Sequence, residues 1–268
     1  SATANSMNLA PGYPIKDFKI GFEWSAPWRY LRIIEALEGN TNHSLEDSEH
    51  LQRDYKSLLA REVISKLPRL SAYDQNLLSD WDFELSPDSS SAALWGVWYY
   101  KHLVPNIKVL IDPYLQRPMG FSEIDSLTVL DLLDTERGKT IAYETLAPAL
   151  NELKKLLGRN PANWHWGDLH KIKFVHPLYD LVNESTREDL EIKPYPRGGS
   201  ANTTNNAGVS AVDFNGRSGA SFRMVIDVGS WYNSAMTNAP GQSGDPKSIF
   251  LRQLIRGLGK RRELSVNL

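Results

Sequence analysis

The stretch Asn160–Leu178, which reads NPANWHWGDLHKIKFVHPL, divides the chain into two parts of different character. Before it the apolar residues follow helical spacing, and after it they alternate as in strands. Asn160 and Pro161 end the preceding helical pattern. Period-2 spacing predicts that Trp164 and Trp166 share one face of an extended segment, where their rings pack against helices of the first part. The stretch therefore predicts a junction between a helical layer and a sheet.

Helical spacing dominates the first part of the chain. Ser44 and Asp47 resemble a capping box, and the apolar residues after them predict one helix that continues to Lys66. Gly158 is expected to end the last helix of this part. Further helices are expected over residues 29–37, 73–85, 91–103, 124–133 and 143–157.

The second part has strand and loop character. FRMVIDV, residues 222–228, alternates as a strand does, and residues 234–239 are expected to pair with it. Residues 195–208, YPRGGSANTTNNAG, are too rich in Gly, Asn, Ser and Thr for regular structure, and a long polar loop inside a compact domain is usually functional or disordered. A final helix is expected over residues 249–258.

Composition excludes several classes of protein. The charges of the 30 basic and 32 acidic residues nearly cancel. The chain therefore has no net positive charge that would attract nucleic acid or an acidic membrane surface. The absence of cysteine excludes disulfides, thiolate metal sites and a cysteine nucleophile. No apolar run approaches the roughly 20 residues that a membrane-spanning helix needs. The chain starts without methionine at SATANSMNL, from which we expect processing or truncation.

Standard catalytic motifs do not fit. His165, His170 and His176 lack the spacing of a zinc-binding HExxH helix, so packing and hydrogen-bonding roles are expected for them. GQSG at residues 241–244 is not the GxSxG elbow of serine hydrolases. The eight tryptophans and eleven tyrosines raise the alternative of a carbohydrate-binding helical protein, but their helical spacing favours core packing.

Six segments in order resemble one family across nearly the whole chain. They are ATANSMNLAPGYP, FEWSAPWRYLRI, LQRDYKSLLARE, NPANWHWGDLHKIKFVHPL, GGSANTTNNAG, and FRMVIDVG followed by APGQSGDP. Each is weak alone, but together they resemble the C-terminal portion of the beta subunit of the penicillin acylase (penicillin amidase) family, within the N-terminal nucleophile hydrolases.

The resemblance implies an α+β fold, part of an αββα sandwich with a large helical excursion. On this basis residues 1–28 would form an oxyanion strand and an aromatic connection, residues 29–157 the helical layer, and residues 158–268 the β-rich part of the sandwich. Family members are made as precursors that cleave themselves and expose an N-terminal serine. That serine attacks an amide carbonyl with its own α-amine as base and forms an acyl-enzyme.

The same resemblance assigns individual residues. The nucleophile is expected on another chain segment, because the context of Ser1 does not match the family's mature start. Asn5 matches the family asparagine whose side-chain amide donates to the tetrahedral intermediate. Arg29 matches an arginine that orients the site near the N-terminal amine, although an exposed residue at a helix start is the alternative for it. Asp17 lies where some members place a calcium-binding aspartate.

The implied activity is hydrolysis of the amide bond of an N-acyl compound, with no cofactor for catalysis and a structural calcium ion at most. The substrate would be a penicillin-type β-lactam or an acyl-homoserine lactone. The implied partners are the alpha subunit and the N-terminal part of the beta subunit, and the implied location is the periplasm or outside the cell. The alternative from another class is a noncatalytic structural module that lacks the nucleophile.

Overall fold

A computed structural model describes residues 12–14, 17, 24–68, 70, 76–114, 124–216 and 218–251. Its α-helices are α1 (Trp28–Glu38), α2 (Leu45–Gln52), α3 (Leu58–Ser65), α4 (Ser90–Val97), α5 (Val104–Lys108), α6 (Ser126–Leu133), α7 (Glu136–Leu157), α8 (Trp166–Leu169) and α9 (Glu184–Leu190). Its strands are β1 (Lys171–Phe174), β2 (Ile192–Pro196), β3 (Phe222–Val225) and β4 (Ala235–Asn238). The fold class is therefore mixed α+β, as predicted.

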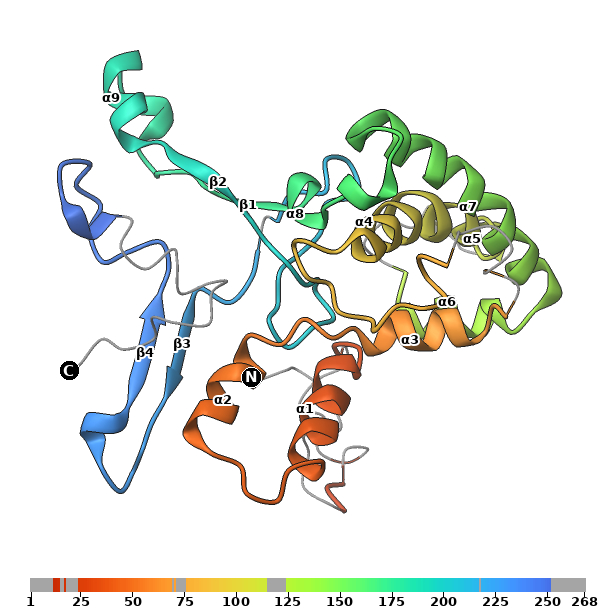
Figure 1. Cartoon of the computed structure of the whole chain (residues 1–268), viewed down its shortest axis with the longest axis horizontal. Helices are drawn as coiled ribbons and strands as arrows, with labels where there is room; N and C mark the ends of the chain where they lie inside the picture. The colour runs from red at the N-terminus through yellow and green to blue at the C-terminus, as the bar shows by residue number, and fades with distance from the viewer. Residues whose placement is uncertain are drawn as a thin grey trace.

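The helices α3 to α7 form one body, shown in orange, yellow and green in Figure 1. Its core includes Trp95, Trp98, Leu103 and Leu146, each at most 1% exposed. The indole of Trp98 donates to the hydroxyl of Thr145 in α7 at 3.1 Å, which satisfies its polar atom inside the core. The helical half of the chain therefore has an apolar centre of its own.

A π-helix, η3 (Trp98–Leu103), joins α4 to α5 without a break. Pro105 lies in the first turn of α5. A proline ring clashes with the carbonyl four residues earlier and cannot donate to it. The widened turn before Pro105 relieves this conflict, so the helix continues through the proline.

The strands form two separate antiparallel pairs. β1 pairs with β2 with a register shift between Ile172 and Phe174. This pair extends as an arm that carries α9 at its end (Figure 1). β3 pairs with β4, with Arg223 opposite Thr237 and Met224 opposite Met236. The predicted pairing of residues 222–228 with residues 234–239 is confirmed.

The β3–β4 hairpin buries one face and exposes the other. Arg223 and Val225 are buried, whereas Phe222, Met224 and Ile226 are 48%, 50% and 42% exposed. The alternation follows directly from the period-2 geometry of a strand. An apolar strand face is thus left open to solvent in this chain.

Two expected helices differ from the structure. The capping box of Ser44 and Asp47 is confirmed, but the helix ends at Gln52, and α3 starts separately after Ser57. Ser57 accepts a hydrogen bond from the backbone N–H of Ala60, so it caps the second helix. The prediction of one helix to Lys66 was therefore wrong.

The expected helix over residues 73–85 is also wrong for the part that the structure describes, 76–85, which consists of turns and extended chain. Phe83 has a positive φ of 66°, a conformation that interrupts a helix. Its carbonyl accepts from the N–H of Ser57, and the N–H of Leu85 donates to Tyr55, so tertiary pairing holds this segment. The other expected helices match α1, α4 with η3, α6 and α7, and Gly158 ends α7 with a φ of 90°. The end of the chain beyond residue 251, including most of the expected final helix, lies outside the described residues.

The predicted junction brings its tryptophans into the core, and the extended segment that joins them is short, Trp164 and His165 only. Trp164 follows a 3-10 turn, η6 (Pro161–Asn163), and Trp166 starts α8. Both rings are 0% exposed. A Cβ built on Gly96 of α4 would lie only 2.4 Å from Cζ3 of Trp166, so the indole packs directly on the α4 backbone. His165, between the two buried tryptophans, is exposed, so the predicted alternation and the packing against the first part are both confirmed, although the extended backbone is limited to Trp164 and His165.

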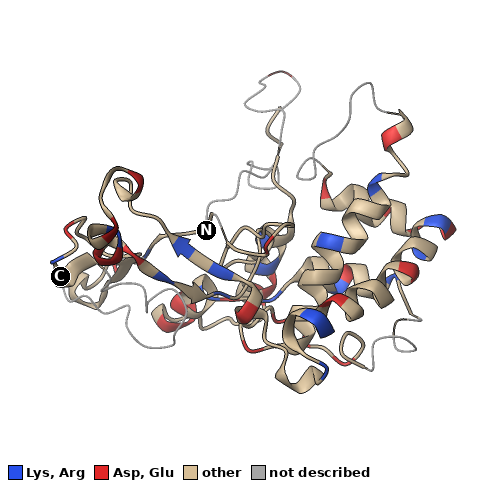
Figure 2. Ribbon diagram, turned by 90° about the horizontal axis from the view of Figure 1, so that it is seen from above, with Lys and Arg blue, Asp and Glu red and all other residues tan. Residues whose placement is uncertain are grey.

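Basic and acidic residues are interspersed along the helices and the arm (Figure 2). None of the helices in the described part of the chain combines the length and apolar character needed to cross a bilayer.

Candidate functional site

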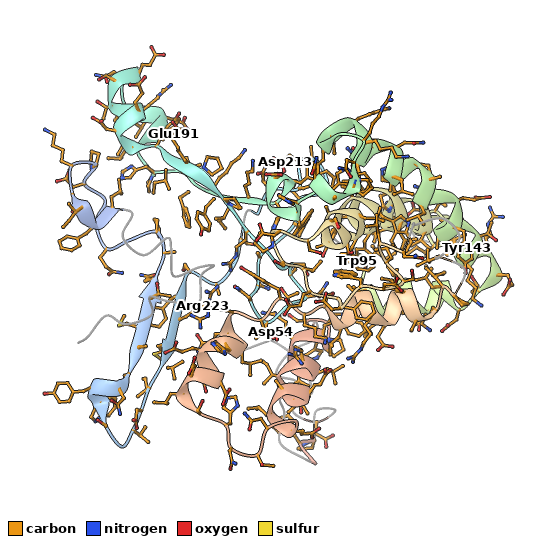
Figure 3. The ribbon with its side chains drawn as sticks, viewed as in Figure 1. Asp54, Trp95, Tyr143, Glu191, Asp213 and Arg223 are labelled. Carbon is orange, nitrogen blue, oxygen red and sulfur yellow. The ribbon has the colours of Figure 1, made fainter. Side chains whose placement is uncertain are left out.

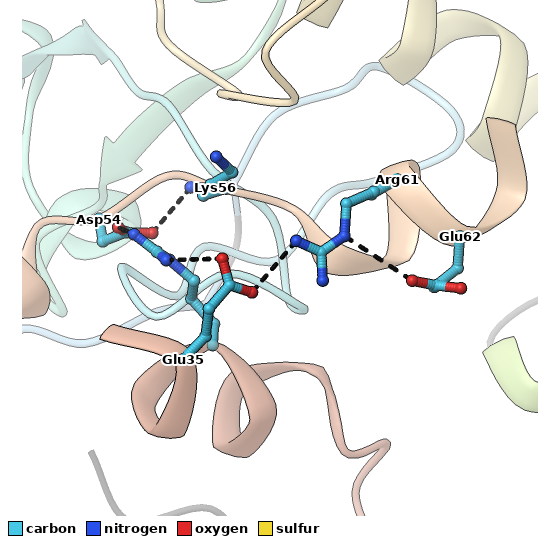
Figure 4. Close-up of polar contacts among 6 residues, drawn as sticks. Glu35, Asp54, Lys56, Arg61 and Glu62 are labelled. Carbon is cyan, nitrogen blue, oxygen red and sulfur yellow. Dashed lines mark hydrogen bonds and ion pairs between the residues drawn. The ribbon is translucent and has the colours of Figure 1, made fainter. Parts of the chain in front are cut away.

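A network of ion pairs fixes α1, the helix that carries Arg29, against the connection between α2 and α3. Arg32 donates to Oδ2 of Asp54 through Nε at 3.1 Å and through Nη2 at 2.6 Å. Its Nη1 lies 3.2 Å from Glu35, which in turn accepts from Arg61 of α3 at 3.1 Å (Figure 4). Oδ1 of Asp54 accepts from the backbone N–H of Lys56 at 2.9 Å. Asp54 therefore binds the helix and shapes the turn before α3.

This network lines an open cleft of about 380 Å³ between α1, α2 and the chain around residue 84. Burial raises the pKa of Glu84, and the neighbouring carboxylates of Asp82 and Asp54 raise it further. The hydrogen bond with Asp54 raises the pKa of Arg32, against the opposing effect of burial. The wall of the cleft is therefore polar and charged, and Arg32 remains its fixed cation. The residues that line it are Arg32, Ala36, Asn40, His43, Asp47, His50, Leu51, Arg53, Asp54, Tyr55 and Glu84.

Arg29 is the one predicted catalytic residue that the structure describes. It is the second residue of α1 and is partly buried, and this burial lowers the pKa of its guanidinium. Arg29 and Arg32 lie three positions apart, so their side chains emerge on the same side of the helix. The Arg32–Asp54 contact thus anchors the helix that carries Arg29, although Arg29 does not line the cleft.

The roles of all the predicted site residues stay predictions. Asn5 and Ser1 lie outside the described residues. Asp17 is exposed in a turn in which its N–H donates to the carbonyl of Pro14 at 3.0 Å. Calcium needs six to eight oxygen ligands. Within the described ranges, no group of three or more His, Cys, Asp or Glu side chains is arranged to hold a metal, so Asp17 stays a prediction that depends on other chain segments.

The three histidines of the junction do not come together. His170 is fully buried, with Nδ1 2.7 Å from the carbonyl oxygen of Arg197 and Nε2 3.3 Å from that of Gly208. Burial lowers the pKa of His170, which keeps the ring neutral at physiological pH. His165 lies 3.8 Å from Asp168, and His176 contacts the carbonyl of Gly244. The expectation of packing and hydrogen-bonding roles is confirmed for His170.

Tyr195 and Pro196 belong to the end of β2, so the predicted loop starts at Arg197, and from there to residue 208 it is largely buried and hydrogen-bonded. Asn205 is its centre. Its Oδ1 accepts from Nη2 of Arg197 and from Nη2 of Arg223, each at 2.5 Å. Its side-chain amide donates to the carbonyl of Arg53 at 3.3 Å, and its backbone N–H donates to the carbonyl of Asp54 at 2.9 Å. One neutral side chain therefore joins two buried guanidiniums to the segment that also holds Arg32.

Figure 3 labels Asp54 and Arg223 near the middle of the molecule, between the β3–β4 hairpin and the helices. Sequence reasoning did not single out Arg32, Asp54, Asn205, Arg197 or Arg223. Arg32 stands three residues after Arg29 in the same WRYLRI segment, which is a usable signal. The other contacts join distant segments, and no local pattern indicates them.

Comparison with known proteins gives the family. The model of the penicillin amidase family, described as "Penicillin amidase", matches residues 1–260, which is nearly the whole of this α+β chain. The chain therefore belongs to the penicillin amidase family, as the resemblance predicted.

Three relatives illustrate the range of the family. The acyl-homoserine lactone acylase QuiP of Pseudomonas putida is 24% identical over 99% of this chain. The protein of the same name from Pseudomonas fluorescens strain Pf-5 is 30% identical over 99% of the chain. The penicillin acylase 2 proenzyme of Pseudomonas sp. strain SE83 is 25% identical over 92%. The alignments cover 36%, 36% and 33% of these three proteins, so the chain spans about a third of the length of the curated relatives it matches.

Proposed function

We propose that this chain is the C-terminal portion of the beta subunit of an acylase that hydrolyses the amide bond of N-acyl compounds. The observation that carries the proposal is the family match over residues 1–260. In this mechanism an N-terminal serine on another segment attacks the amide carbonyl, with its own α-amine as base. The amine suits this role because its unperturbed pKa is near ~8.

In the proposed site, Asn5 donates its side-chain amide to the oxyanion of the tetrahedral intermediate, and Arg29 orients the groups around the N-terminal amine. The rigid attachment of α1 through Arg32 and Asp54 supports the role of Arg29, because an orienting residue needs a fixed base. Asp17 contributes to a structural calcium site that other segments complete. No step of the reaction uses this ion.

We further propose that the alpha subunit and the rest of the beta subunit cover the open face of the β3–β4 hairpin and complete the αββα sandwich. The exposed side chains of Phe222, Met224 and Ile226 support this, because an apolar strand face in water is normally packed against another layer. The alignments cover only 36% and 33% of two relatives, whose further residues correspond to the proposed partner segments. One of these relatives is named a proenzyme. The complete enzyme then acts in the periplasm or outside the cell.

The names of the relatives favour acyl-homoserine lactones as the substrate over penicillins. Two of the three relatives above are named acyl-homoserine lactone acylases, and one is named a penicillin acylase. We therefore expect the complete enzyme to hydrolyse an N-acyl homoserine lactone at the amide, with a larger kcat/KM than for a penicillin.

The test measures release of the free amine from both substrate classes by the complete enzyme. Faster turnover of the lactone amide supports the proposal. Faster turnover of the penicillin would still support an acylase activity, but with penicillins as the preferred substrate. Failure to hydrolyse either compound, with the precursor correctly cleaved, would support the noncatalytic alternative.

A further inference from the structure

Two buried guanidiniums meet at Asn205, and Arg223 forms no ion pair with an acidic side chain of the described residues. Arg197 and Arg223 are 2% and 5% exposed. Both donate to a single neutral oxygen, Oδ1 of Asn205. A buried cation is costly unless an anion pairs with it, and two adjacent cations repel each other. The arrangement therefore calls for a negative charge beside it.

Arg223 shows where that charge belongs. Its Nη1 is buried and makes no hydrogen bond with any residue in the described ranges. Its ionisable neighbours are Arg197, Tyr55 and Arg53, and none of these is a carboxylate. Burial, and next to it the charge of Arg197, lowers the pKa of Arg223 to about 10. The guanidinium stays charged at neutral pH, with one donor nitrogen unused.

Two hydroxyl groups next to Arg223 are also unused. Thr237 lies directly opposite Arg223 in the β3–β4 register, so both side chains are on the buried face of the hairpin. Its hydroxyl is buried and has no partner among the described residues. The same holds for the hydroxyl of Tyr55, whose ring packs on Gly198: a Cβ built there would lie 2.7 Å from Cε2. A charged donor and two hydroxyls with unused hydrogen-bonding capacity thus lie on neighbouring residues, since Thr237 is opposite Arg223 and Tyr55 is its electrostatic neighbour.

We propose that Arg223, Thr237 and Tyr55 form a binding site for a carboxylate or similar small oxyanion. A guanidinium and two hydroxyls are the donors that such a group prefers. The anion comes either from an acidic side chain of the other chain segments proposed above or from a free ion. In both cases it pairs with Arg223 and fixes the β3–β4 hairpin to the helical body. The first source rests on the proposed function, whereas the binding of a free ion does not, and neither depends on acylase activity.

The experiment compares thermal unfolding of the complete protein with that of the Arg223→Met variant. Acetate and phosphate are titrated at constant ionic strength against chloride, and unfolding is also followed from pH 7 down to pH 4. Methionine keeps the length of the apolar stem and removes the charge. Arg159→Met, at an exposed position in the loop after α7, is the matched control.

Two results support the site. If the anion is free, acetate or phosphate raises the Tm of the wild type and leaves that of Arg223→Met unchanged. If the anion is a side chain of the protein, added oxyanion has no effect, but Arg223→Met lowers the Tm at pH 7. This loss shrinks toward pH 4, because the carboxylate that has lost its cation takes up a proton.

One result overturns the proposal: no response to oxyanion, together with a Tm loss that is the same at pH 7 and pH 4, as expected for packing alone. If Arg223→Met does not fold, Thr237→Val keeps the volume and the charge and removes one hydroxyl. We then expect the midpoint of the oxyanion titration to rise about tenfold, since a hydrogen bond to a charged group contributes at least ~1.4 kcal/mol. For a side-chain anion, Thr237→Val produces the same pH-dependent loss of Tm. An unchanged midpoint and an unchanged pH profile in this variant overturn the site.

Discussion

Replacement of Trp166 by alanine is expected to lower the free energy of unfolding of the complete protein by about 3–5 kcal/mol, the usual cost of removing a fully buried tryptophan. The ring is 0% exposed and lies against the α4 backbone at Gly96. It stacks on His170 with ring centroids 4.8 Å apart, and its Nε1 donates to the carbonyl of Gly199 at 3.4 Å. One side chain thus holds α4, α8 and the polar loop together.

Urea denaturation of the wild type and the variant measures this effect. Trp231→Ala is the matched control, because Trp231 is 67% exposed and its removal creates no cavity. We expect the control to stay within about 0.5 kcal/mol of the wild type. If Trp166→Ala were equally mild, the junction would not be part of the core that stabilises the protein.

Replacement of Asn5 by alanine in the complete enzyme is expected to lower kcat by about 10²–10³, the usual cost of losing one oxyanion donor. KM is expected to change little, because the interaction is made mainly in the transition state. Steady-state hydrolysis of an acyl-homoserine lactone measures both constants. The assembly and its cleaved chains, followed by gel filtration and intact mass, are expected to be unchanged.

Asn151→Ala provides the matched control for Asn5, since Asn151 is exposed on α7, and we expect it to retain wild-type kcat. A loss of kcat below threefold for Asn5→Ala would place the oxyanion donor on another residue. A loss of assembly instead of turnover would give Asn5 a structural role.

The junction was predictable because its signals are local. Gly158 caps the end of α7, and Pro161 starts the 3-10 turn that follows it. The closely spaced large rings of Trp164 and Trp166 indicate burial whichever backbone conformation they adopt. The capping box at Ser44 was readable for the same reason, since its reciprocal hydrogen bonds join residues only three positions apart. The break before α3 is hidden in the sequence because Leu51, Tyr55, Leu58 and Leu59 keep helical spacing across it. The signal that marks the break is Ser57, the N-cap of α3.

The polar loop shows why the rest was not predictable. From Arg197 on, its composition correctly indicates irregular structure, but burial of Asn205 depends on Arg197, Arg223 and the carbonyl of Arg53, which come from separate parts of the chain. Such long-range pairing leaves no periodic trace in the sequence. Arg29 was found only through the resemblance to a family, while its support by Arg32 and Asp54 required the folded chain.

Intact mass spectrometry of the native assembly, with N-terminal sequencing of every chain in it, shows whether the nucleophile lies on another segment. We expect a companion polypeptide that starts with serine, generated by cleavage of one precursor, and hydrolysis of acyl amides that depends on this serine. If the assembly hydrolyses acyl amides with Ser1 as its only N-terminal serine, the nucleophile lies in this chain and the proposed arrangement is wrong.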